Sequence, residues 1–307
     1  MKNSLKIAIL SYRSAPFGGG QGIYVYELSK VLKELGHQVD IISGPPYPEL
    51  MHGIELIKLP GLNLFSTFKF RDRLDLFLNK KNKSFDDWYE FGSTLLGGFP
   101  ELQTFGNRAH SYLLDKTYDV VIDNQSISYG AVKIQDSFPL VEIMHHPISK
   151  DYYYDLKFAK GILQSISKIR WYSFLKMQKS AAKKINVVAT PSMNSKEDIH
   201  IDFQVPMENI QVIPNGIDCD IFCPLPQILS KKNRLITTAS ADVPLKGLDF
   251  SLEAIARLKP EYPDIHLIII GSPRKEGHTE RLLKKLELEN HVSFRTNLTK
   301  EEITQEY

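Results

Sequence analysis

The chain has 307 residues, 42% of them hydrophobic and 24% charged, a composition typical of a globular protein long enough for two domains. Its net charge of +2 gives no reason to expect a nucleic-acid binder. The two cysteines, Cys219 and Cys223, form neither a disulfide framework nor a zinc site, which favours the reducing cytoplasm. We expect neither a signal peptide nor a transmembrane helix, because no apolar run is long enough.

Short β-branched runs alternate with helical patterns along most of the chain. An apolar run over 5–11 predicts a buried strand, and a helical stripe of Tyr24, Leu28, Val31 and Leu35 follows it and ends before Gly36. Further strands are predicted at 37–43, 53–60, 118–124, 139–146 and 185–192. This alternation predicts an α/β fold with a parallel sheet that helices cover on both faces.

The segment from about 61 to 116 interrupts this alternation. It mixes aromatic with charged residues, as in "STFKFRDRLDLFLNKKNKSFDDWYEF", and is predicted to be an insertion between core strands. Insertions of this kind often carry specificity for a substrate or partner, because loops can vary while the scaffold stays fixed.

A stretch rich in proline and polar residues, "PNGIDCDIFCPLPQILSKKN", separates this part from the next. After it, strands are predicted at 234–240, 265–271 and 291–297, with helices between them, and Thr299 with Glu302 has the spacing of a capping box. The prediction is an N-terminal domain over 1–222, a linker over 223–232 and a further domain over 233–307. That last part is about half as long as an α/β domain needs, so we expect the sequence to be a piece of a longer protein.

Three consecutive glycines, Gly18, Gly19 and Gly20, lie between the first strand and the first helix. The dinucleotide-binding pattern G-x-G-x-x-G fails here, because Ile23 and Val25 stand where its third glycine belongs. No Gly-Lys-Ser/Thr follows, which excludes a Walker A loop. Backbone N–H groups at a helix N-terminus remain, and these can bind an anion. The alternative is a tight turn that needs glycine only for its shape.

A similar arrangement occurs in the second half, in "TTASADVPLKGL". Lys246 and Gly247 stand at the start of a helix whose stripe is Leu248, Leu252, Ile255 and Leu258. A lysine is electrostatically unfavourable at a helix N-terminus, and a bound phosphate would remove the conflict. The alternative is a solvated surface lysine.

Five stretches of the chain resemble glycosyltransferase family 4: "GGGQGIYVYELSKVLKELGHQVDII", "VEIMHH", "VVATPSMNSKEDI", "VIPNGIDCDIF" and "TTASADVPLKGLDFSLEAIARL". The resemblance implies the GT-B fold, with two Rossmann-like, doubly wound domains, the second only partly present here. It also implies an enzyme that moves a sugar from a UDP-, GDP- or ADP-sugar to a glycan or lipid-linked acceptor, with retention of configuration. Neither a metal nor another cofactor is expected.

The resemblance also assigns roles to single residues. His145 matches the active-site histidine, although the adjacent His146 is an alternative match, and Lys246 matches the basic residue that neutralises the departing diphosphate. The residues expected to bind the donor are Gly18, Gly19, Gly20, Ser240, Lys246, Gly247 and Gly271. Asn124 and His146 are candidates for the acceptor side.

Some features depart from the family pattern. The family has an arginine where residues 240–242 read Ser-Ala-Asp, so either Arg274 or Lys275 assists or Lys246 acts alone. The family's glutamate-rich donor motif falls beyond residue 307, so we expect the sequence as it stands to be inactive. The acidic pair in "DCD" (218–220) resembles a metal site, but it follows "PNGI" in the predicted linker, and no metal is expected there.

Between residues 156 and 196 the chain has nine lysines and arginines and no acidic residue. Over 156–184 these bases alternate with large apolar residues, as in a basic helix that lies on an anionic bilayer. The alternative is a helix that covers the core and exposes a charged face. The sequence thus predicts a cytoplasmic protein, with peripheral contact at the inner face of the membrane as one of two interpretations.

Two other functions stay open. A GT-B nucleotide-sugar epimerase would form its product without an acceptor. A non-catalytic module that binds a nucleotide sugar would keep the fold without turnover.

Overall fold

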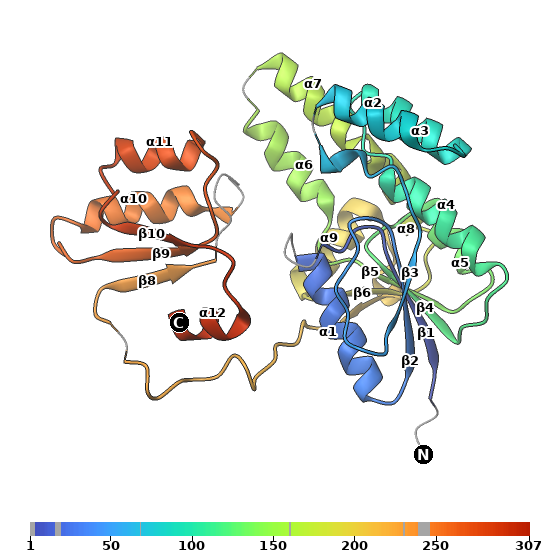
Figure 1. Cartoon of the computed structure of the whole chain (residues 1–307), viewed down its shortest axis with the longest axis horizontal. Helices are drawn as coiled ribbons and strands as arrows, with labels where there is room; N and C mark the ends of the chain where they lie inside the picture. Colours follow the sequence, from blue (N-terminus) through green and yellow to red (C-terminus); the bar gives the residue numbers. More distant parts are fainter. Residues whose placement is uncertain (1–3, 16–19, 68, 160, 230, 239–245) are drawn as a thin grey trace. The chain divides into compact units, whose positions relative to one another are not determined.

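The computed structural model describes residues 4–15, 20–67, 69–159, 161–229, 231–238 and 246–307. It divides into a first unit, Met1–Pro214, and a second unit, Asn215–Tyr307 (Figure 1). The predicted linker over 223–232 therefore clusters with the second unit. None of the described helices is both long enough and apolar enough to span a membrane.

A parallel seven-stranded sheet forms the centre of the first unit, in the order β3-β2-β1-β4-β5-β6-β7. This is a doubly wound order, and it reverses between β1 and β4, the point at which such sheets bind ligands. The strands are β1 Lys6–Ser11, β2 Gln38–Ser43, β3 Glu55–Lys58, β4 Val120–Asn124, β5 Leu140–Ile143, β6 Val188–Thr190 and β7 Ile210–Val212.

Both faces of this sheet are buried, as the sequence predicts. Along β1, Ala8 and Leu10 pack into the larger core, whereas Ile7 and Ile9 pack on the other face with Val25 of α1. Strand side chains alternate between the two faces, so a continuous apolar run marks a strand that is covered on both. The first-unit helices are α1 Gly20–Glu34, α2 Phe70–Asn79, α3 Phe85–Leu95, α4 Glu101–Leu113, α5 Tyr129–Ile134, α6 Ile148–Lys157, α7 Ile162–Trp171, α8 Leu175–Ala182 and α9 Met193–Phe203.

The sequence prediction misplaced the buried face of one helix and missed one strand. In α1 the predicted stripe is out of register: Val31 and Leu35 are exposed, and Val25 is buried instead. Strand β7 was not predicted, because three residues are too few to show a periodic pattern. The end of α1 was placed correctly, since Gly36 has the left-handed φ of 91° that favours glycine after a helix.

The segment over 61–116 has two parts. Its last helix, α4, connects β3 to β4 and buries Leu102, Phe105 and Ala109, so it belongs to the main scaffold. The part before it, with α2 and α3, has a small core of its own built from Leu62, Leu64 and Phe77. Only this earlier part is an addition to the sheet.

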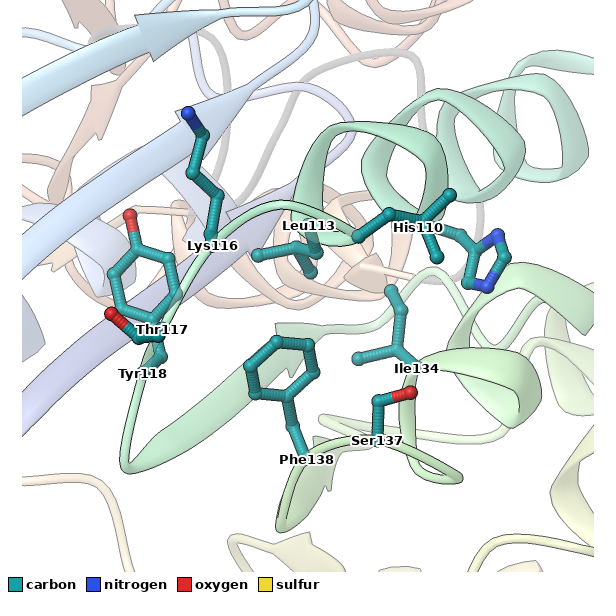
Figure 2. Close-up of a pocket in the computed structure, with 9 residues that line it drawn as sticks. His110, Leu113, Lys116, Thr117, Tyr118, Ile134, Ser137 and Phe138 are labelled. Atoms are coloured by element: carbon teal, nitrogen blue, oxygen red, sulfur yellow. The ribbon is translucent and has the colours of Figure 1, made fainter.

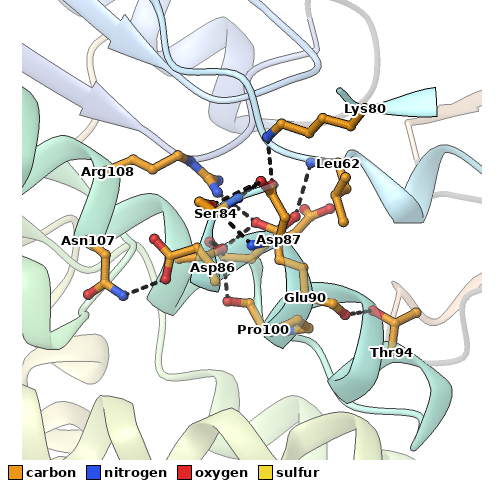
Figure 3. A network of polar contacts seen from close by, with 12 residues as sticks. Leu62, Lys80, Ser84, Asp86, Asp87, Glu90, Thr94, Pro100, Asn107 and Arg108 are labelled. Carbon is orange, nitrogen blue, oxygen red and sulfur yellow. Dashed lines mark hydrogen bonds and ion pairs between the residues drawn. The ribbon is translucent and has the colours of Figure 1, made fainter. Parts of the chain in front are cut away.

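A buried polar network attaches the added part to α4 (Figure 3). The Glu90 carboxylate of α3 accepts hydrogen bonds from the Leu62 N–H at 3.0 Å, the Thr104 hydroxyl at 2.5 Å and the Arg108 guanidinium at 2.8 Å. Nearby, Lys80 forms an ion pair with Asp87 at 2.6 Å. Because Glu90 is only 1% exposed, these donors replace the water that would otherwise solvate its carboxylate.

The second unit contains a three-stranded parallel sheet in the order β10-β9-β8. The predicted capping box at Thr299 and Glu302 is present at the start of α12. Three of the four predicted stripe residues of α10 are buried, and Leu258 is exposed. The elements are β8 Arg234–Thr237, α10 Leu248–Leu258, β9 His266–Ile270, α11 His278–Lys285, β10 Val292–Arg295 and α12 Lys300–Glu306.

Candidate functional site

The candidate site of the first unit lies at the carboxyl ends of β1, β4 and β5. Arg13 follows β1, Asn124 ends β4, and His145 follows β5 by two residues. Because the strands are parallel, these ends meet at one edge of the sheet, next to the reversal of strand order.

His145 is held from three sides at this edge. Its ring Nε2–H donates to the Asn124 side-chain oxygen at 2.8 Å, and its backbone N–H donates to Gln125 Oε1 at 3.2 Å. The ring of Tyr24, from α1, meets the imidazole edge-on with 4.5 Å between ring centroids. The ring and its backbone are therefore both fixed.

The electrostatic setting keeps His145 neutral. Burial, and secondarily the neighbouring His146, lowers the pKa of His145 to about 4. Because Nε2–H donates its hydrogen bond to Asn124, the Nδ1 atom is unprotonated in the neutral ring and its lone pair can accept a hydrogen bond. A neutral imidazole of this tautomer can accept a hydrogen bond from a hydroxyl group at Nδ1, whereas it lacks the positive charge that would bind an anion.

The two adjacent histidines differ in their surroundings. His146 is exposed, and its Nε2 lies 3.0 Å from Asp151 Oδ2 of α6. Of the predicted residues Asn124, His145 and His146, the structure brings only the first two together at the sheet edge.

The glycine loop is described only in part. Gly18 and Gly19 lie outside the described residues, and Gly20 is the first residue of α1 with no atom within 4 Å of a Cβ built on it. Two residues on, a Cβ at Gly22 would lie 2.3 Å from the Ala15 carbonyl oxygen, so the close approach of the loop to the helix requires glycine there.

In the second unit, Lys246 is exposed just before Gly247, which caps α10 with a left-handed φ of 70°. Gly271 directly follows β9, at the same edge of the second sheet as the start of α10. The His278 imidazole lies 2.7 Å from the Asp249 carboxylate, and this contact links the first turn of α11 to the first turn of α10. Ser240 lies outside the described residues.

Three acidic residues near the first-unit site are not among the residues predicted from the sequence. Glu101 of α4 pairs with Arg13 at 2.8 Å and so fixes a guanidinium at the end of β1. Asp123 and Glu142 are fully buried in β4 and β5. An acidic residue inside an apolar strand was the available signal, because such residues are rarely buried without a purpose.

A pocket of the first unit lies elsewhere. It has about 350 Å³ and is lined by the last turns of α4 and α5 and the residues after them, at the amino ends of β4 and β5. Figure 2 shows His110 and Lys116 on either side of Leu113, Ile134 and Phe138. Because ligands of doubly wound sheets bind at the carboxyl ends, this pocket is not the candidate site.

Two protein-family models match this chain, one over each of its two parts. The model of Glycosyltransferase Family 4 matches residues 18–221, and that of Glycosyl transferases group 1 matches 226–307. The chain belongs to glycosyltransferase family 4. The MMP alpha-(1->4)-mannosyltransferase of Mycolicibacterium hassiacum is 39% identical over 303 residues, which are 97% of this family 4 chain and 72% of that protein.

Solved structures agree with the GT-B fold of this family 4 protein. Anabaena Alr3699/HepE, solved with UDP and glucose, has a TM-score of 0.61 at 16% identity, over 98% of this chain and 71% of that one. TarM has a TM-score of 0.60 at 12% identity, over 98% and 78%. The family and its fold make the chain a glycosyltransferase, as the sequence resemblance implies.

Proposed function

We propose that this glycosyltransferase moves a hexose from a nucleoside-diphosphate sugar to a glycan or lipid-linked acceptor, with retention of configuration and without a bound metal. The observation that carries the proposal is Lys246, an exposed cation directly before the N-terminus of α10. Breaking a sugar–phosphate bond leaves negative charge on the diphosphate, and an ammonium group with helix N–H groups can stabilise that charge. In support, Anabaena HepE was solved with UDP and glucose.

The first unit would contribute hydrogen bonds to the sugars. His145 offers Nδ1 as an acceptor because Asn124 takes its Nε2–H. Arg13, paired with Glu101, offers the guanidinium protons that this carboxylate does not use. Groups of this kind orient hydroxyls, and orientation is what a transfer between two sugars needs.

Ligand-observed NMR on the full-length gene product with UDP-, GDP- and ADP-hexoses tests the donor class, with NAD as the control. We expect one nucleotide to be preferred and NAD not to bind. Binding of NAD alone would contradict the proposal. Product formed without an acceptor would indicate an epimerase, and binding without turnover would indicate a non-catalytic module.

We also infer that α7 contacts an anionic membrane surface. Ile162 and Leu163 are 80% and 86% exposed, and α7 buries none of its ten residues. Two of the nearby bases have partners within the first unit, since Lys168 pairs with Asp155 at 2.6 Å and Arg170 donates to the Leu96 carbonyl. The exposed apolar residues, rather than those two bases, therefore provide the surface to test.

Replacing Ile162 and Leu163 together with serine should abolish co-sedimentation with phosphatidylglycerol vesicles. The matched control is Ile201→Ser on α9, which is also exposed and should leave binding unchanged. The inference is wrong if the unmodified protein does not sediment with these vesicles. It is also wrong if the double variant binds the vesicles as well as the unmodified protein does and differs only in self-association, which size-exclusion chromatography measures.

A further inference from the structure

Two acidic side chains lie next to each other beneath the His145 site. Asp123 of β4 and Glu142 of β5 are register partners on adjacent parallel strands, and both are 0% exposed. Register partners on neighbouring strands point to the same face, so the two carboxyl groups share one buried environment.

No cation accompanies this pair within the described part of the chain. Asp123 Oδ2 accepts the Ser126 hydroxyl, whereas Asp123 Oδ1 and both Glu142 oxygens accept no hydrogen bond of ordinary geometry among the described residues. Backbone N–H groups of loop 125–127 face both carboxyl groups and partly offset the effect of burial on their pKa values. Helix α8 adds the buried amide of Gln178, which donates to the Ser126 carbonyl, and Lys179 of the same helix lies over the ring of Phe203. Ser128, the uncharged residue that caps the N-terminus of α5, lies next to Ser126.

A single proton would satisfy this arrangement. Two neighbouring carboxylates cannot both stay ionised in a buried site. If Glu142 is the acid, its O–H can donate to Asp123 Oδ1, and this hydrogen bond then joins two oxygen atoms that otherwise lack one of ordinary geometry. Burial raises the pKa of Asp123 to about 6, and burial together with the Asp123 charge raises the pKa of Glu142 well above its ordinary value.

The loop that follows Asp123 connects the pair to the site. Gln125 and Ile127 have positive φ values of 64° and 47°, a left-handed conformation that non-glycine residues rarely adopt. Such a conformation persists only where the surroundings hold it. The same loop supplies the Asn124 and Gln125 side chains that bind the ring and backbone of His145.

We propose that Asp123 and Glu142 share one proton and act as positioning residues, holding loop 124–127 so that Asn124 and Gln125 fix His145. The part of this inference that concerns catalysis rests on the proposed function; the structural part does not.

The raised pKa values of Asp123 and Glu142 determine how the stability of the protein changes with pH. Aspartate and glutamate ionise near pH 4 in the unfolded chain, roughly, and both folded pKa values are raised. The stability that the protonated pair contributes is therefore complete at low pH and is lost as the pH rises through the folded pKa values. Asp123 loses its proton first, at a pKa of about 6, and the shared proton on Glu142 leaves only at higher pH.

The experiment uses Glu142→Gln, whose amide N–H can donate to Asp123 at every pH, and Glu142→Leu, which removes the donor. We measure the unfolding midpoint from pH 6 to about 9 and the histidine Cε1 signals by NMR, with His145→Gln to assign the His145 signal. The unmodified protein should lose stability and shift the His145 signal as the pH rises. Glu142→Gln should show a smaller dependence of both, and Asp136→Asn, an exposed control, should behave like the unmodified protein.

Glu142→Leu should shift the His145 signal at every pH and lower kcat about 10–100-fold, and Glu142→Gln should restore most of the rate. If Glu142→Gln keeps the original pH dependence, or if Glu142→Leu leaves the His145 signal unchanged, the proposal fails. If Glu142→Leu does not fold, Glu142→Gln and Asp123→Asn are compared with the unmodified protein instead. The proposal then fails if neither variant reduces the pH dependence of the unfolding midpoint. A full-length gene product without transfer activity would contradict the proposed function, and the stability and NMR measurements would still test the shared proton.

Discussion

Replacing Lys246 with alanine is expected to lower kcat by about 10²–10³-fold, the usual effect of removing one group that stabilises charge in the transition state. Lys246 is exposed beside the N-terminus of α10, where the partial charges of the helix are positive. On the proposed function, its ammonium group would interact most strongly with the departing diphosphate, whose charge grows as the sugar bond breaks. Initial rates with the preferred donor, fitted for kcat and KM, measure this effect.

The control for this variant is Lys284→Ala. Lys284 is an exposed lysine on α11 of the same unit, so the change in net charge is identical. We expect its kcat to stay near that of the unmodified protein, and Lys246→Arg to retain part of the activity. An unchanged kcat with a raised donor KM in Lys246→Ala would show that the lysine binds only the ground state.

Replacing Glu90 with alanine is expected to lower the free energy of unfolding by about 3–5 kcal/mol, as when one partner of a buried ion pair is removed. The substitution leaves the Arg108 guanidinium, the Thr104 hydroxyl and the Leu62 N–H without their acceptor. Denaturant unfolding followed by circular dichroism measures the loss.

Two further variants define the cause of that loss. Glu90→Gln keeps an oxygen acceptor and should cost less than the alanine variant. Asp75→Ala removes an exposed carboxylate from the neighbouring α2 and should change stability by no more than about 0.5 kcal/mol. Equal losses for Glu90→Ala and Asp75→Ala would mean that the network in Figure 3 contributes little.

The parts of the fold that the sequence predicted are those with local signals. The apolar runs of β1 and β2, the end of α1 before Gly36 and the capping box at Thr299 are each visible within a few residues. The buried face of α1 was misjudged because several of its residues are apolar, and only packing on the sheet decides between Val25 and Val31.

The candidate site divides in the same way. The sequence identified His145, Asn124 and Lys246 as candidates, but not the bond between His145 and Asn124, which are 21 residues apart. Asp123 and Glu142 become neighbours only through the pairing of β4 with β5, and Arg13 meets Glu101 only through α4. Contacts between distant parts of a chain leave no periodic trace in the sequence.

The added part of the first unit has a consequence for how this enzyme family can diversify. Leu62, Leu64 and Phe77 form a core apart from the main one, and Glu90 attaches this part to α4. Figure 1 shows α2 and α3 at the same end of the unit as α7. Substitutions there alter the surface near α7 without changing the spacing of the strands. A segment exchanged here by evolution or by an engineer would therefore have to keep an acceptor for Arg108 and the contact with α7, whereas the strands and their His145 edge lie outside it.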